Sequence, residues 1–357
     1  MKKARNILAL LLSVALIFTC LTACGKKDTN GGTAETTGDS SADVKERTIQ
    51  IGHISGVSDD DKYQSLANYF AKYVSDYSDG KIKIEVVGGG GLGDERTMLE
   101  GMSLGTTDMA ILTNSTLCQF VEEYMILELP YLFTNRFAAN EFFTSTDLLD
   151  SMDQKLRDEQ NCVVLARAEC GPRHCVNNDH PYNTVDDLKG VKMRTMESEM
   201  PLAIFKAFGA NPTPLAWSDC FTAVQQKTID AVEIPINSIY SDGYYEICKY
   251  ISLTAHQYAS SLICMSDDLY SDLSDAEKDI ISKAAKQAAQ DQIQFLNDSE
   301  AEMIQKMKDN GCEINEPDLT SFKEAVEPVY QKYRDKFGAD VFDPIVEQAQ
   351  EISAKYN

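Results

Sequence analysis

The sequence has 357 residues and carries 56 acidic against 33 basic side chains, which gives a formal net charge of −23 at pH 7. A charge of this sign argues against nucleic acid and anionic lipid as direct partners, because both are themselves negative. Any site for an anion must therefore be a local positive island in a negative field. The length allows two lobes or one large domain.

The N-terminal residues have the pattern of a bacterial lipoprotein signal. Basic side chains in residues 2–5 precede an apolar stretch from Ile7 to Phe18, which is too short to span a bilayer. The residues that follow at 21–25, LTACG, have the form of a lipobox. We therefore expect residues 1–23 to be a signal peptide and Cys24 to be the lipidated first residue of the mature chain. The alternative is an ordinary signal peptide with an incidental cysteine.

Gly, Thr, Ser and Asp dominate the stretch after the lipobox. Such a composition cannot bury a core, so residues 24–46 are expected to form a flexible tether. A diacyl anchor with a thioether-linked head is a two-chain attachment, strong enough to hold a protein at a membrane. The expected location is the extracytoplasmic face of the cell membrane, with the lipid at Cys24 as the membrane contact.

The hydrophobic pattern after the tether alternates between strands and helices. Apolar residues recur at period two in residues 48–54 and 81–87, and an unbroken apolar run covers residues 108–112. Helical patterns begin near Asp59 and at Asp94, whose carboxylate is expected to cap the second helix. This β-α-β-α-β order predicts an α/β sheet.

Ligands bind to such sheets outside the carboxyl ends of the strands. That rule directs attention to Ser55, residues 91–94 and residues 113–115. The glycine run at residues 88–91 is not followed by the GK[ST] of a phosphate-binding loop. We interpret it as a sharp turn whose backbone lies close to a cleft.

A second α/β cycle begins with an apolar strand at residues 162–166, and a strand at residues 229–235 stops at a proline. Between them, residues 188–214 combine a strand that carries Arg194 with a helix that begins at Ser198. A strand-borne guanidinium beside a helix N-terminus is suited to clamp a carboxylate. The alternative is a surface arginine at the end of a strand.

The remaining helices are predicted from their caps and apolar stripes. Ser218 is expected to cap a helix of the second cycle. Ser274 and Glu277 have the spacing of a capping box at the start of a long helix over residues 274–310, which would lie across both lobes. Two shorter helices close the chain, near residues 319–337 and 344–356.

Ten cysteines could suggest a disulfide framework, but two lie at or before the lipobox and the other eight match no zinc spacing. Several of these eight lie in apolar runs, where cysteine acts as a small hydrophobic residue. Only Cys170, His174 and Cys175 form a metal-like cluster, and it lacks CxxC or HxxxH spacing. We therefore expect no metal site and no cofactor. Many unpaired thiols in an exported chain would suit an anaerobic host.

Four runs together give the chain a family resemblance: GGLGDERTMLEGMSLGTTDMAIL, ELPYLF, DLKGVKMRTMES with FKAFGANPTPLAWSDCFTAVQQKTIDAVE, and the long late helix. Over about residues 48–340 the sequence resembles the DctP-type substrate-binding proteins of TRAP transporters. The resemblance implies two α/β lobes, joined by crossing strands and a spanning helix, that close on an organic acid. It also implies delivery of that acid to a membrane permease driven by a sodium gradient, without ATP.

The resemblance also assigns site residues. Arg194 matches the family arginine that clamps the substrate carboxylate, and Arg173 matches a second arginine that steadies the site. Asp94 and Thr113 match pocket positions of the first lobe. Trp217 stands where an aromatic residue packs on the ligand.

Two further positions have a less regular match. Glu197 follows the arginine motif, where other members carry a variable polar residue. At residues 232–235 the family usually reads QENP, whereas this chain reads VEIP, so that Ile234 replaces the asparagine that helps to hold the carboxylate. Either Ile234 enlarges an apolar wall or Asn237 compensates, and the sequence leaves both open.

The expected fold class is α/β, a two-lobe periplasmic-binding-protein-like fold with a long helix that spans both lobes. Lobe I is expected to comprise residues 47–170 and about 258–299, and lobe II residues 171–257 and about 300–357.

The expected function is that of an extracytoplasmic solute-binding protein and not of an enzyme, since G-x-S-x-G and HExxH patterns are absent. A sugar acid or uronate is the first expected ligand, a C4-dicarboxylate the second, and an aromatic or keto acid the third. The rival functions are an ABC-type solute-binding lipoprotein and a ligand-sensing ectodomain.

Overall fold

The computed structural model describes residues 44–356. The expected signal peptide, the lipidation site Cys24 and the tether up to residue 43 lie outside the described residues. Within residues 44–356, no helix combines the length and the apolar character that crossing a bilayer requires.

Two residues near the end of the expected tether, Val44 and Lys45, contact the folded body. Val44 packs against buried hydrophobic side chains. The backbone N–H of Lys45 donates to Glu277 Oε1 over 2.9 Å. The held part of the chain therefore begins before residue 46, earlier than the sequence predicts.

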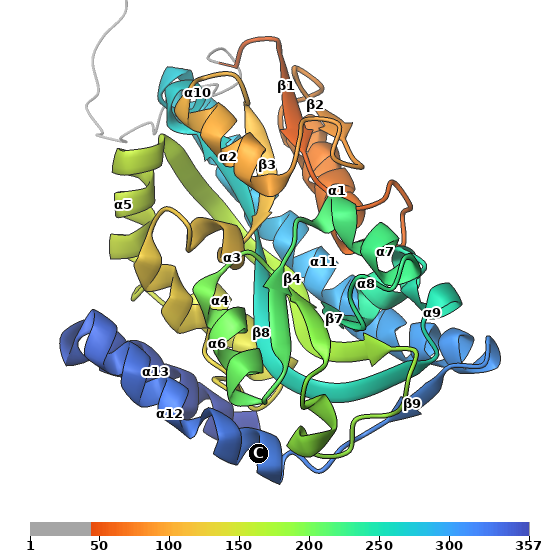
Figure 1. Cartoon of the computed structure of the whole chain (residues 1–357). Helices are drawn as coiled ribbons and strands as arrows, with labels where there is room; N and C mark the ends of the chain where they lie inside the picture. The colour runs from red at the N-terminus through yellow and green to blue at the C-terminus, as the bar shows by residue number, and fades with distance from the viewer. Residues whose placement is uncertain (1–43, 357) are drawn as a thin grey trace, which may run out of the picture. The chain divides into compact units, whose positions relative to one another are not determined.

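One mixed sheet forms the framework of this body (Figure 1), with the strand order β2-β1-β3-β8-β4-β7-β5-β6 and with β9 paired to β8. Its strands are β1 (Arg47–Gly52), β2 (Ile82–Val87), β3 (Met109–Thr113), β4 (Cys162–Asn177), β5 (Lys192–Thr195), β6 (Asn211–Pro214), β7 (Ala231–Pro235), β8 (Tyr250–Ser266) and β9 (Glu313–Asn315). The two longest strands, β4 and β8, pair antiparallel at the centre of the sheet. They connect a parallel group of strands on each side, as the resemblance implies.

The first parallel group confirms the predicted β-α-β-α-β start. Strand β1 pairs in parallel with both β2 and β3, and α1 (Lys62–Tyr77) and α2 (Glu95–Ser103) form the crossovers between them. Asp61 caps α1, and Asp94 caps α2 by accepting a hydrogen bond from the backbone of Thr97 over 2.7 Å. The carboxyl ends of β1 and β3 therefore lie next to each other.

The second parallel group contains β5, which pairs with β6 on one side and β7 on the other. Strand β6 was not predicted, because Pro212 and Pro214 are unusual within a strand. It lies at the edge of the sheet, where proline is tolerated. Ser198 caps α6 (Glu199–Ala207), as expected. The predicted cap of the next helix is wrong: α7 (Trp217–Gln225) begins one residue before Ser218, with Ala216 at the cap position.

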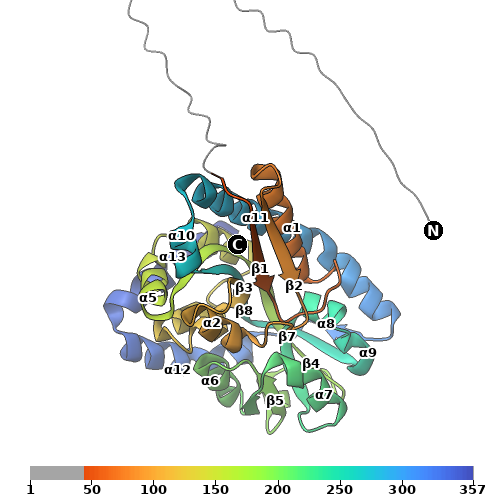
Figure 2. The ribbon, with the colours of Figure 1, turned by 90° about the horizontal axis from the view of Figure 1, so that it is seen from above.

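The long helix is confirmed as α11 (Asp275–Asp309), and its first turn carries the capping box of Ser274 and Glu277. Its 35 residues span roughly 50 Å at the usual rise. The helix packs along α1 on one side of the sheet and against β4 and α8 (Ile236–Ser241) further along (Figure 2). It therefore contacts both parallel groups.

The last two helices, α12 (Thr320–Phe337) and α13 (Ala339–Ser353), lie side by side (Figure 1). Helix α13 packs on α4 (Arg136–Ser145) and α12 on α6, so they contact both parts of the molecule. The expected lobe boundaries near residues 170, 257 and 299 fall inside β4, β8 and α11 and stay a prediction. The remaining short elements are α3 (Asn114–Leu117), η2 (Glu122–Glu128), α5 (Asp150–Gln160), η3 (Val185–Leu188), α9 (Tyr244–Ile247), α10 (Asp267–Asp272) and η4 (Ala354–Tyr356).

Candidate ligand-binding site

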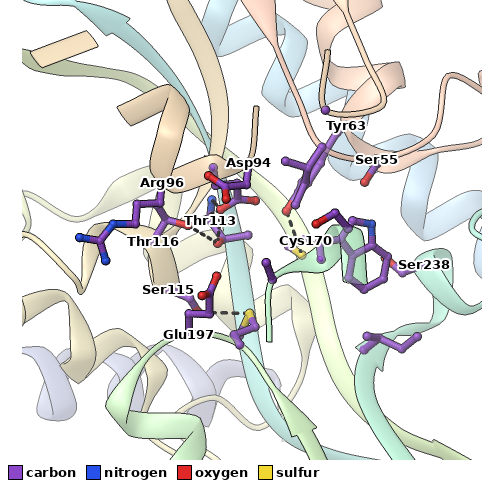
Figure 3. Close-up of a pocket in the computed structure, with 18 of the residues that line it drawn as sticks. Ser55, Tyr63, Asp94, Arg96, Thr113, Ser115, Thr116, Cys170, Glu197 and Ser238 are labelled. Atoms are coloured by element: carbon purple, nitrogen blue, oxygen red, sulfur yellow. Dashed lines mark hydrogen bonds between the residues drawn. The ribbon is translucent and has the colours of Figure 1, made fainter. Parts of the chain in front are cut away.

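A cavity of about 370 Å³ opens where the carboxyl ends of the strands meet, a volume within the usual range for small-molecule sites. Segments that follow β1 and β3 line it from one side, and the ends of β5 and β7 with the start of α7 line it from the other. Figure 3 shows hydroxyl, carboxylate and sulfur-bearing side chains converging on this space. The rule that ligands bind at strand ends correctly indicated Ser55, Asp94, Thr113 and Ser115 as lining residues.

Arg173 reaches the cavity because β4 is irregular there. Alternation along a regular strand would place Cys170 and Arg173 on opposite faces, yet both line the cavity. The register of β4 against β8 shifts between Glu169 and Gly171, where Gly171 adopts a φ of 117° that L side chains rarely adopt. Such a bulge redirects the side chains beside it.

The guanidinium of Arg173 is paired inside the protein. Its Nε donates to the carboxylate of Glu233 on β7, and its Nη2 donates to the backbone carbonyl of the same residue over 2.5 Å. The imidazole Nε2 of His256, on β8, lies 3.8 Å from Glu233 Oε2. Burial acts to raise the pKa of Glu233, but Arg173, the neighbouring His256 and Arg194 lower it to about 2. Glu233 is therefore ionised, and it holds Arg173 in place.

Arg194 is a buried guanidinium with one nitrogen left over. Its Nε and Nη2 both donate to the carbonyl of Leu215, over 3.0 and 2.7 Å. Its Nη1 lies 3.9 Å from Glu233 Oε1 and has no hydrogen-bond partner among the described residues. The guanidinium lies over the ring of Trp217, 5.7 Å from the ring centre. An anionic oxygen would satisfy this unpaired donor.

The first-lobe side of the cavity is organised by an acid that the sequence analysis missed. Asp94 is exposed and caps α2, but the next residue, Glu95, is buried. Glu95 Oε2 accepts hydrogen bonds from the backbone and the hydroxyl of Thr113, over 2.9 and 2.6 Å, and from the hydroxyl of Thr116. Its Oε1 has no partner within the described part of the chain. Thr113 therefore orients Glu95.

The other predicted residues occupy different places. Glu197 is exposed and Trp217 half-buried, and both line the cavity. Ile234 is fully buried and also lines it, as an apolar wall. Asn237 is not among the lining residues, because its amide accepts from the backbone of Lys62 over 3.0 Å and donates to the carbonyl of Asp60 over 2.8 Å. Asn237 therefore joins α8 to the start of α1, and the proposed compensation for Ile234 finds no support.

Sequence reasoning also missed Lys62, Tyr63, Cys170 and Ser238 as lining residues. Tyr63 lies on the predicted apolar stripe of α1, so it was interpreted as a core residue. Its hydroxyl lies 3.7 Å from Cys170 Sγ. Lys62 stands in the first turn of the same helix, where a lysine usually faces solvent. Only the placement of that helix end beside the cavity could have indicated it.

The side chains of Cys170, His174 and Cys175 do not come together as a metal-ligand set in the described residues. Within residues 44–356, no three His, Cys, Asp or Glu side chains are placed to hold a metal ion. His174 Nδ1 accepts a hydrogen bond from the backbone of Ala255 over 3.2 Å, which fixes its neutral form. All eight cysteines of the described residues are free and buried.

The sequence matches a family described as bacterial extracellular solute-binding protein, family 7, over residues 51–336. A solute-binding protein of Verminephrobacter eiseniae is 32% identical over 280 residues, which are 77% of this chain and 82% of that protein.

Two crystal structures show the same fold. A sugar acid binding protein from Advenella mimigardefordensis in complex with galactonate has a TM-score of 0.82 at 27% identity, covering 87% of this chain and all of that one, 100%. A TRAP periplasmic solute binding protein from Polaromonas bound to D-erythronate has a TM-score of 0.80 at 32% identity, covering 84% and 98%. With its two-lobed α/β fold and its family match over most of its length, the chain belongs to the DctP family of bacterial extracellular solute-binding proteins, the solute receptors of TRAP transporters.

Proposed function

We propose that this protein captures the carboxylate of a small organic acid outside the cytoplasmic membrane and delivers the acid to a TRAP-type membrane permease. The observation that carries the proposal is the unpaired Nη1 of Arg194 in the buried wall of the cavity. An unpaired buried charge is costly, so an anion that reaches it is bound strongly. Arg173, fixed by Glu233, adds a second positive charge beside it.

A sugar acid or uronate is the ligand class that the cavity favours, with a C4-dicarboxylate as the second candidate. Hydroxyl-bearing side chains line much of the wall, and Glu95 offers an acceptor without a partner. Sugar hydroxyls need such donors and acceptors when they leave water. The relatives bound to galactonate and D-erythronate carry ligands of this class.

Ile234 restricts how the carboxylate is held. Since Ile234 offers no hydrogen bond and Asn237 is engaged elsewhere, the guanidinium of Arg194 carries more of the binding free energy than in relatives with an asparagine. We expect the substitution Arg194→Ala to weaken binding by more than about 3 kcal/mol, the range for breaking a buried charge pair.

The cell-membrane anchor is part of the same proposal. Lipidation at Cys24 would keep the receptor near its permease after export. Membrane fractionation of cells that carry the natural chain or Cys24→Ser tests it: the natural chain should sediment with membranes and the variant should be released. Equal sedimentation of both would contradict lipid anchoring at Cys24.

The function is tested by a thermal-shift screen of the chain from residue 25 onward against a panel of organic acids. Because a ligand that binds only the folded state raises the melting temperature by mass action, a sugar acid should raise it by several degrees. The shift should vanish in Arg194→Ala. If no carboxylate shifts the natural protein, even after unfolding and refolding to remove a co-purified ligand, the proposed function is wrong.

A further inference from the structure

Resting on the proposed function, we propose that the cavity takes one carboxylate only, and that Lys62 and Glu95 bind the uncharged, hydroxylated end of the ligand. The site would then select monocarboxylic sugar acids over dicarboxylic ones of the same chain length. Lys62 would be a specificity-determining residue of this receptor.

Lys62 is a buried cation in the wall of the cavity. Its side chain is only 3% exposed, and its Nζ donates to Ser238 Oγ over 2.6 Å and contacts Ser55 Oγ at 3.5 Å. Its ammonium also lies 4.3 Å from the centre of the Tyr63 ring. Figure 3 shows Ser55, Tyr63 and Ser238 together on one side of the pocket, away from Arg96 and Ser115. Lys62 therefore offers its donors to that side of the cavity.

The charge of Lys62 is already balanced by the protein. No carboxylate of the described residues lies within 4.0 Å of its Nζ, but Asp61 and Asp242 are close enough to act on it. Burial tends to lower the pKa of Lys62, but the net shift is upward, because nearby carboxylates, Asp61 foremost and then Asp242, favour the charged ammonium. Lys62 thus stays charged without an anion from the ligand, and beside Ser55 and Ser238 its N–H groups can donate to a ligand hydroxyl.

Glu95 supplies the complementary acceptor. It is 7% exposed, and no cation of the described residues forms an ion pair with it. A ligand hydroxyl could donate to its unpartnered Oε1, whereas a second ligand carboxylate would meet a like charge in a poorly solvated space. The wall therefore accepts a hydroxyl more readily than an anion near Glu95.

The two arginines on the other side of the cavity also favour a single ligand carboxylate. The charge of Arg173 is paired with Glu233, and Arg194 shares that carboxylate only at 3.9 Å. Arg194 and Lys62 both lack a carboxylate within hydrogen-bond distance, but among the buried cations of the described lining residues Arg194 alone has a nitrogen, Nη1, without a hydrogen-bond partner. One ligand carboxylate therefore satisfies the unpaired donor of Arg194, and no second carboxylate is needed.

Matched pairs of acids test this inference by calorimetry: galactonate with galactarate, gluconate with glucarate, and erythronate with meso-tartrate. The members of each pair differ only in a terminal hydroxymethyl or carboxylate group. In the natural protein, the monoacid of every pair that binds should bind at least tenfold more tightly than its diacid. Glu95→Gln, which removes the like charge, should narrow that ratio at least fivefold.

Lys62→Gln should weaken binding of the monoacid at least tenfold. It should weaken binding of the diacid less, since the second carboxylate of the diacid is already poorly accommodated near Lys62 and Glu95. The matched controls lie on the same helices: exposed Lys72 on α1 and exposed Glu100 on α2. Lys72→Gln and Glu100→Gln should leave both ratios unchanged. A loss of affinity that is equal for monoacid and diacid in Lys62→Gln would show that Lys62 only supports the fold, and would overturn its role.

The remaining outcomes separate this inference from the proposed function. If diacids bind as tightly as monoacids, and Arg194→Ala abolishes both, the single-carboxylate inference is wrong while the proposed function stands. If no acid of any pair binds and the wider screen of acids gives no thermal shift, both are wrong.

Discussion

Arg194 and Glu233 face each other across 3.9 Å without a hydrogen bond, although both side chains are buried. Glu233 instead accepts hydrogen bonds from Arg173, through both its carboxylate and its backbone carbonyl. One carboxylate therefore keeps one arginine in position and leaves a neighbouring arginine short of a partner. Under the proposed function, this unequal sharing is the source of the affinity of the cavity for an anion.

The first prediction concerns that carboxylate. Glu233→Gln leaves the buried Arg173 without a counter-charge, and we expect the free energy of unfolding to fall by about 3–5 kcal/mol. Urea denaturation measures the loss. The control is Glu313→Gln, in the exposed pair of Lys249 and Glu313, where the loss should not exceed about 1 kcal/mol. Equal effects of the two substitutions would show that the burial of the Arg173 pair contributes nothing.

A second prediction concerns acid stability. Burial lowers the pKa of His174 to about 3, and its Nδ1 must stay unprotonated to accept the Ala255 N–H. The unfolded chain takes up a proton below about pH 6.5, while the folded chain does so only near pH 3. The free energy of unfolding should therefore fall as the pH drops through this interval, by an amount on the order of 5 kcal/mol from this group.

Urea denaturation at pH 7, 5.5 and 4 measures the dependence on pH. In His174→Gln the free energy of unfolding should decrease less steeply between these pH values than in the natural protein. Parallel pH dependences would mean that His174 takes up its proton at the same pH in the folded and the unfolded chain, against its contact with Ala255.

A third prediction concerns Ile234, which is fully buried between the cavity and the core around β7. Ile234→Asn introduces the asparagine that the family resemblance implies at this position and buries an amide that has no hydrogen-bond partner. In the absence of ligand it should lower the free energy of unfolding by about 1–3 kcal/mol. Ile234→Val should cost about 0.5–1.5 kcal/mol, since it only removes a methylene group. A stable Ile234→Asn variant would show that this wall can rearrange to satisfy the amide.

A fourth prediction concerns the eight buried thiols of the described residues. Burial raises the pKa of several of them, Cys175 to about 12 and Cys220 to about 11, so they are poor nucleophiles in the folded state. A thiol reagent should react slowly with the folded chain from residue 25 onward and should find eight thiols after unfolding. Fewer than eight thiols under non-reducing denaturation would show disulfides that the structure lacks.

Periodicity predicted much of the fold. The alternating strands β1 and β2, the buried strand β3, the capping box of α11 and the cap of α6 were all evident, because each depends on residues close in sequence. The long strand β8 was not predicted as an element. It is buried almost throughout and crosses from one parallel group to the other, so its sequence shows no single alternating face.

The site was harder to predict. Arg194 was indicated by its strand and the helix start beside it, and the family resemblance then gave roles to Arg173 and Arg194. Glu95 was missed, because only the capping role of its neighbour Asp94 was recognised. Lys62 was missed because the burial of a lysine depends on what folds over it, here the nearby Ser55 and, from a distant segment, Ser238. Local patterns do not report such placement.

The position of β8 also bears on how the chain acquires its structure. This strand inserts between β3 and β4, so that Leu112 pairs with Leu262 and Arg167 pairs with the same residue from the other side. Until residues 250–266 are available, β3 has an open edge of unpaired backbone groups, which invites pairing with another chain. Pairing over such sequence separations is slow. The β3 edge of the first parallel group therefore stays uncovered while the chain emerges, and a chaperone that delays folding until residues 250–266 are available would protect it from aggregation.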